Sequence, residues 1–77
     1  MKMPRDINSD ELIKVVSQYG YNISRQTGSH IRLTNKDGSH NITIPNHSPI
    51  KIGTLSSIIK DICTINNISI SDFIKKL

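Results

Sequence analysis

The chain of 77 residues carries a formal net charge of +4, a single cysteine, no tryptophan and only 4% aromatic residues. This length suits one compact domain over residues 1–77, with a core built from aliphatic side chains. One cysteine excludes an internal disulfide, which agrees with a reducing cytoplasm. No apolar stretch approaches the ~20 residues of a membrane span, so we expect a soluble cytoplasmic protein without a membrane partner. The basic charge favours a polyanionic partner.

The first predicted element is a helix that begins near Asn8 and Ser9, whose side chains offer capping oxygens. Glu11 follows Asn8 at the spacing of a capping box, and Gly20 supplies the C-terminal stop. Between these signals, apolar residues recur at the helical spacing i, i+3, i+4 and i+7, which gives the helix one apolar stripe: Leu12, Val15, Val16 and Tyr19.

Two predicted β-strands flank a turn at Gly28–Ser29. In the first strand, residues 21–27, apolar residues alternate with polar ones at the start of the segment. The second strand, residues 30–34, directs its two aliphatic residues to the core. The same alternation leaves His30 and Arg32 on the opposite, open face of the sheet.

A third strand follows the turn Asn35–Gly38, in which Asp-Gly tolerates the positive φ of a tight hairpin. Its aliphatic residues point inward, and Pro45 ends it because proline cannot donate to the strand ladder. His40 lies beside the turn, and the sequence leaves its exposure open.

Two more helices complete the chain. Gly53–Thr54 offers a capping hydroxyl for the second helix, and Ser69 with Asp72 predicts a short third one. The resulting order α-β-β-β-α-α predicts an α+β two-layer sandwich, with helices on one face of an antiparallel sheet and water on the other. The apolar stripe of the second helix comprises Leu55, Ile58, Ile59 and Ile62.

Five short motifs occur in order along the chain: Met3–Pro4–Arg5, Gly20–Tyr21, Arg25-Gln26-Thr27-Gly28-Ser29-His30, Ile44-Pro45-Asn46-His47 and Gly53-Thr54-Leu55-Ser56-Ser57-Ile58. Together they resemble the HicA family of toxins from toxin–antitoxin pairs, over nearly the whole chain. The resemblance implies a double-stranded-RNA-binding-domain-like fold and an endoribonuclease that cleaves mRNA and is neutralised by a HicB antitoxin. It also implies that His30, the histidine of the Gly-Ser-His motif, is catalytic.

The chemistry of RNA cleavage agrees with these residue types. Cleavage without a metal needs a base for the 2′-hydroxyl, a cation for the phosphorane and an acid for the leaving oxygen, and imidazole exists in both protonation states near neutral pH. His30 beside Arg32 suits a ribonuclease that needs no metal, and the resemblance implies that its substrate is mRNA, as in an mRNA interferase. His47 is a second proton carrier, a phosphate contact or a solvated loop residue. The candidate RNA-binding residues are Gly28, Ser29, Arg32, Lys36 and His47.

Other interpretations stay open. The three histidines are ten and seven residues apart, which matches no compact metal-ligand pattern, so no metal or other cofactor is expected. A non-catalytic RNA-binding module of the same fold would recognise A-form RNA by shape and phosphate contacts. Such modules usually keep basic clusters at a helix N-terminus, and residues 53–62 offer almost none. The third possibility is an interaction subunit that docks another protein on the open sheet face.

Overall fold

The computed structural model describes residues 3–77, so the first two residues of the predicted 1–77 domain lie outside the described residues. Its elements, in chain order, are α1 (Ser9–Gln18), β1 (Asn22–Thr27), β2 (His30–Thr34), β3 (Asn41–Pro45), α2 (Ile52–Asn66) and α3 (Ile70–Lys75). The strands form one antiparallel sheet in the order β1-β2-β3. The predicted α+β class and the double-stranded-RNA-binding-domain-like order of elements are confirmed.

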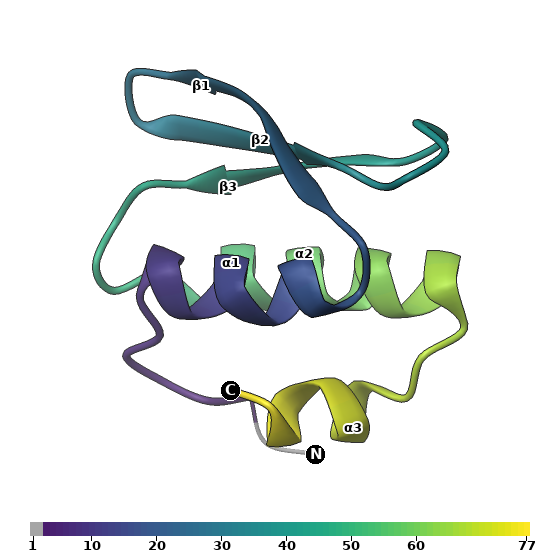
Figure 1. Cartoon of the computed structure of the whole chain (residues 1–77). Helices are drawn as coiled ribbons and strands as arrows, with labels where there is room; N and C mark the ends of the chain where they lie inside the picture. The colour runs from purple at the N-terminus through teal and green to yellow at the C-terminus, as the bar shows by residue number, and fades with distance from the viewer. Residues whose placement is uncertain (1–2) are drawn as a thin grey trace.

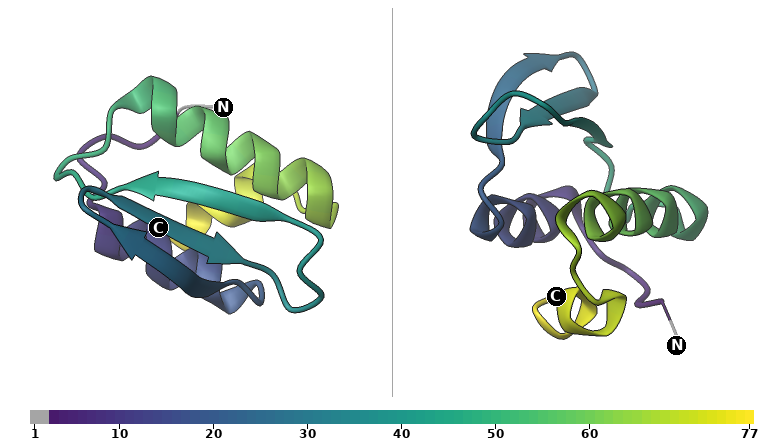
Figure 2. Two further views of the ribbon diagram at one scale, coloured as in Figure 1. Left: turned by 90° about the horizontal axis from the view of Figure 1, so that it is seen from above. Right: turned by 90° about the vertical axis from the view of Figure 1, so that its right-hand side faces the viewer.

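The elements are stacked in layers (Figure 1). Helices α1 and α2 lie side by side under one face of the sheet, and α3 packs beneath them on the side away from the sheet (Figure 2, right). The other face of the sheet carries no helix (Figure 2, left). In the described part of the chain, no helix combines the length and apolar character that crossing a membrane requires.

The core lies mainly between the sheet and the two long helices. The predicted stripe of α2 is buried along its whole length, and Tyr21, which precedes β1, is fully buried as well. Cys63 also faces this core, and burial raises the pKa of its thiol, which keeps the sulfur protonated and unreactive. Below the helices, the fully buried Phe73 of α3 stacks on Tyr19 with 5.5 Å between ring centroids.

Local capping explains the starts of α1 and α3, but not the start of α2. The backbone N–H of Asn8 donates to Glu11 Oε1 at 3.4 Å, as expected for α1, and that of Asp72 donates to the Ser69 hydroxyl at the start of α3. The predicted start of α2 at Gly53–Thr54 is wrong, because the helix begins at Ile52. Buried Ile50, whose N–H donates to the Ile7 carbonyl at 2.8 Å, fixes the chain just before the helix, which then starts at once without a side-chain cap.

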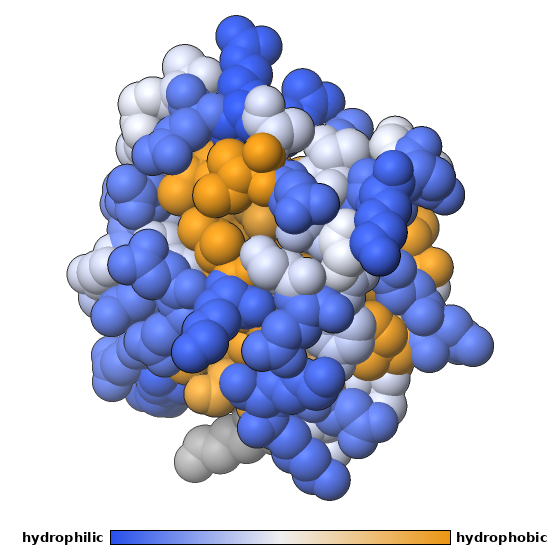
Figure 3. Space-filling view, viewed as in Figure 1, coloured by the Kyte–Doolittle hydropathy of each residue, from blue (hydrophilic) through white to orange (hydrophobic). Residues whose placement is uncertain are grey.

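Strand β1 is an edge strand, and all six of its residues are exposed. Even Ile23, which pairs with the buried Leu33, is 52% exposed. In the view of Figure 3, an apolar area lies between the sheet and the helix layer, surrounded by polar side chains. The helices therefore cover β2 and β3 much better than they cover β1.

The two ends of the sheet meet different elements (Figure 1). At one end, the β1–β2 turn and the end of β3 lie above the N-termini of α1 and α2. At the other end, the β2–β3 turn lies above the C-terminal ends of the same helices. We call the first the histidine end, because it carries His30 and His47, and the second the turn end.

Candidate functional site

The turn between β1 and β2 fixes the position of His30. It has two residues, Gly28 and Ser29, and Gly28 has a φ of +54°, the conformation that favours glycine at the first position of a type II′ hairpin turn. His30 is therefore the first residue of β2, paired with Thr27 on one side and Pro45 on the other. A longer or looser connection would leave this imidazole on a mobile loop.

The alternation predicted for β2 is confirmed. Ile31 and Leu33 are buried at 4% and 0% exposure, whereas His30 and Arg32 are exposed. Residues that pair directly across antiparallel strands share a face. The open face therefore carries three cross-strand rows: Thr27–His30–Pro45 at the histidine end, then Arg25–Arg32–Thr43, then Asn22–Thr34–Asn41.

Arg25 reaches this face through a β-bulge that the sequence did not reveal. If the alternation of Tyr21 and Ile23 continued along β1, Arg25 would point to the core side. The register instead shifts between Ile23 and Arg25, so that Arg25 pairs with Arg32 on the open face. Sequence reasoning missed Arg25 as a site residue, and the one available signal was its place in the Arg25–His30 motif.

The loop after β3 brings His47 to the same end of the sheet as His30. The backbone N–H of Asn46 donates to the Ser29 carbonyl at 2.6 Å, and the Asn46 side chain accepts a hydrogen bond from the hydroxyl of buried Ser9 at 3.0 Å. Asn46 thus ties the β1–β2 turn to the start of α1. His47 follows directly, is exposed, and lies next to this tie.

Lys36 lies apart from the other candidates. Because a strand rises about 3.3 Å per residue, the two ends of β2 are about 13 Å apart, and Lys36 lies beyond the far one. A Cβ added to Gly20 would lie 3.8 Å from Cγ and Cε of Lys36, so the lysine stem packs beside the end of α1. Next to it, hydrogen bonds from Ser39 lower the pKa of Asp37. The structure therefore does not bring Lys36 together with His30.

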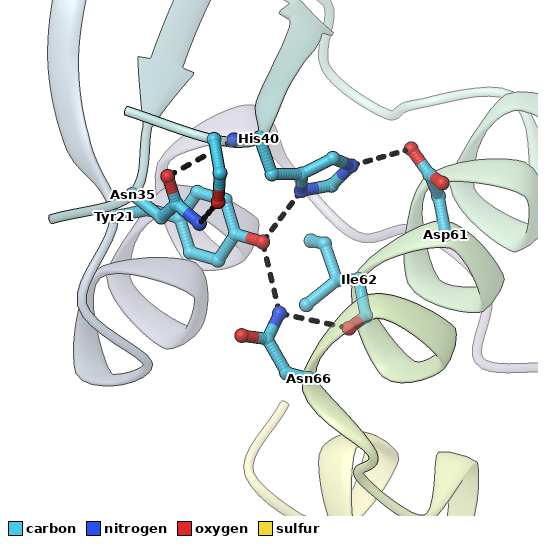
Figure 4. Close-up of polar contacts among 7 residues, drawn as sticks. Tyr21, Asn35, His40, Asp61, Ile62 and Asn66 are labelled. Atoms are coloured by element: carbon cyan, nitrogen blue, oxygen red, sulfur yellow. Dashed lines mark hydrogen bonds and ion pairs between the residues drawn. The ribbon is translucent and has the colours of Figure 1, made fainter. Parts of the chain in front are cut away.

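His40, whose exposure the sequence left open, is half-buried at the turn end (Figure 4). Its Nδ1 lies 2.6 Å from the Tyr21 hydroxyl and its Nε2 lies 3.1 Å from Asp61 Oδ2. Because Asn66 Nδ2 donates to the tyrosine oxygen at 2.8 Å and to the Ile62 carbonyl, the tyrosine proton is free for His40 Nδ1. His40 then donates from Nε2 to Asp61, and the cluster joins the start of β3 to α2.

We expect His40→Ala to lower the free energy of unfolding by about 1–3 kcal/mol, because the buried Tyr21 hydroxyl loses its acceptor. Urea denaturation of the wild type, His40→Ala, Tyr21→Phe and the double variant measures this effect. The double variant should lose less than the sum of the single losses, since both remove the same hydrogen bond. Strictly additive losses would show that the two side chains do not interact.

The open face is electrostatically one-sided. Its two charged strand residues are Arg25 and Arg32, and none of the six acidic residues falls in a strand. Among residues 3–77 the ion pair found is His40–Asp61, which lies at the turn end. Neither arginine of the open face is therefore neutralised by a described carboxylate, which leaves both available to an anion.

Comparison with protein-family models matches residues 9–62 to the family described as HicA toxin of bacterial toxin–antitoxin. The match runs from the start of α1 into α2, covers well over half of the chain, and includes both His30 and His47. Searches of curated proteins and of solved structures gave no match. The chain belongs to the HicA family of bacterial toxins, which act within toxin–antitoxin pairs.

Proposed function

We propose that this toxin is an endoribonuclease that cleaves mRNA in the cytoplasm without a metal ion and is neutralised by a HicB-type antitoxin. The observation that carries the proposal is the exposed imidazole of His30, held by a tight turn beside Arg32 on a sheet face whose strands carry no acid. Family membership shows that the protein is a toxin, and the basic, histidine-bearing face supports RNA as its substrate.

The cleavage step needs three groups. His30 takes the proton of a ribose 2′-hydroxyl, and the 2′-oxygen forms a bond to the adjacent phosphorus. Arg32, two residues along the same face, stabilises the negative charge that builds on the phosphorane oxygens. The bond from phosphorus to the 5′-oxygen then breaks, and that oxygen receives a proton from His47 at the same end of the sheet. The products are a 2′,3′-cyclic phosphate and a 5′-hydroxyl.

The other candidate residues act around this step. Gly28 and Ser29 form a turn with little side-chain bulk, which lets the RNA backbone come close to His30. Lys36 lies at the turn end, so it contacts only an RNA that is long enough to extend along the sheet from His30. An antitoxin that covers the open face and sets acidic groups against Arg32 would exclude RNA by steric overlap and by charge.

We expect purified protein to cleave single-stranded RNA at the same rate in excess EDTA as without it, because each proposed proton transfer uses a side chain. The measurement is a gel-based cleavage assay with end analysis of the fragments. Cleavage should weaken as salt rises, because counterions compete with phosphate contacts. Activity that vanishes in chelator and returns with magnesium would contradict the mechanism, and binding without cleavage would favour the RNA-binding module.

A further inference from the structure

The geometry points to an additional RNA contact: Arg25 and Arg32 form a cross-strand clamp that holds one phosphate of single-stranded RNA next to His30. This inference rests on the proposed function, because RNA is the substrate named there. It adds Arg25, which the bulge brings to the open face, and it gives the two arginines one shared ligand.

The arginine pair is unfavourable without an anion. Directly paired side chains in an antiparallel sheet lie with their Cβ atoms about 5 Å apart, and like charges in such a pair destabilise the sheet. Arg25 pairs with Arg32, and the next residue across the sheet is the uncharged Thr43. Neither arginine forms a salt bridge within residues 3–77. A phosphate between the guanidinium groups would turn repulsion into attraction.

The bulge that creates this pair is itself held by side chains. The Ser24 hydroxyl lies 3.3 Å from the Arg32 carbonyl oxygen and 2.8 Å from the Thr34 hydroxyl, within hydrogen-bond distance of both. These bonds attach the bulged residue to β2, which keeps Arg25 opposite Arg32. Guanidinium groups bind phosphate oxygens through two parallel hydrogen bonds, so two of them facing one site suit a phosphodiester.

The position of the pair relates it to the reaction. The row Arg25–Arg32–Thr43 is the next row along the open face after the row that contains His30. In the proposed mechanism Arg32 faces the phosphate that is cut, so the phosphate held by the clamp is that one, one row from the imidazole. Arg25 is thus a binding residue that sets where the RNA strand lies over His30.

The test measures binding separately from cleavage. A fluorescein-labelled, 2′-O-methylated single-stranded RNA cannot be cut through its 2′-oxygen, and fluorescence anisotropy gives its dissociation constant for wild type, Arg25→Gln, Arg32→Gln and Arg25→Lys. We expect about tenfold weaker binding for each glutamine variant, the loss typical of a charge-assisted hydrogen bond. Because the two arginines share one phosphate, the double variant Arg25→Gln/Arg32→Gln should reduce the magnitude of the log–log salt slope by about 0.7, the value for one fewer neutralised phosphate. Arg25→Lys, which keeps the charge, should keep the slope.

Lys60→Gln removes the same charge from α2, away from the sheet face, and should leave binding unchanged. Arg25→Gln should melt no lower than wild type, because it relieves a like-charge pair. The clamp would be overturned if Arg25→Gln bound RNA as tightly as wild type. It would also be overturned if this variant lost affinity only for the antitoxin and not for RNA. Cleavage of unmodified RNA decides the proposed function independently, because a protein that binds RNA through the clamp but never cuts it would fail only that assay.

Discussion

Replacing His30 by alanine is expected to lower the rate of RNA cleavage by about 10²–10⁴-fold, the usual contribution of one positioned acid–base group. The fold should be unaffected, because the imidazole is exposed and has no side-chain hydrogen bond within residues 3–77. Surface substitutions of this kind usually change stability by less than about 0.5 kcal/mol. Initial cleavage rates together with thermal unfolding of the same preparation measure both effects.

Two further variants sharpen this result. Asn22→Ala also truncates an exposed residue of the open face, in the row farthest from His30, and should cleave at the wild-type rate. His47→Ala should slow cleavage if His47 protonates the leaving oxygen, and should leave stability unchanged because the side chain is exposed. A His30→Ala protein that is folded and cleaves as fast as wild type would show that catalysis lies elsewhere.

Replacing Phe73 by alanine is expected to cost about 3–5 kcal/mol of unfolding free energy, the usual loss for a fully buried phenylalanine. The Phe73 ring stacks on Tyr19. Lys76, which directly follows α3, places its Nζ 4.7 Å from the centroid of the Tyr19 ring. Small domains have only about 0.05–0.15 kcal/mol of stability per residue, so the loss would remove much of the total. Urea denaturation followed by circular dichroism measures it.

Ile65→Ala, on the exposed side of α2, provides the matched control and should change the urea midpoint little, since Ile65 is 54% exposed. A wild-type midpoint in Phe73→Ala would mean that α3 does not take part in the cooperative unfolding of the domain. A lower midpoint with a reduced m-value would indicate that α3 detaches before the rest unfolds.

Local patterns were sufficient to predict much of the fold. The alternation in β2 fixes which face His30 and Arg32 take, because one side of the sheet has to meet the helices. The capping residues of α1 and α3 act over a single turn, so their effect is visible in the sequence. These features depend on neighbours within a few residues.

Other features depend on distant partners and could not be predicted this way. The start of α2 is set by the hydrogen bond between Ile50 and Ile7, which are 43 positions apart. The bulge in β1 depends on the contact between Ser24 and β2, and it places Arg25 on the face opposite to the one that a regular alternation from Tyr21 and Ile23 would give. The sequence predicts Lys36 as a phosphate contact at the end of the second strand, but the length of β2 separates this residue from His30.

The cluster of His40, Tyr21, Asp61 and Asn66 holds the sheet to α2 at the end opposite His30. The half-buried imidazole of His40 and the exposed imidazoles of His30 and His47 therefore lie at opposite ends of one small sheet. One substitution at His30 can therefore remove the exposed imidazole of β2 without touching the contacts that hold the sheet to α2. If an antitoxin covers the open face, as proposed above, such a variant would keep most of the covered surface and would compete with active copies for the antitoxin.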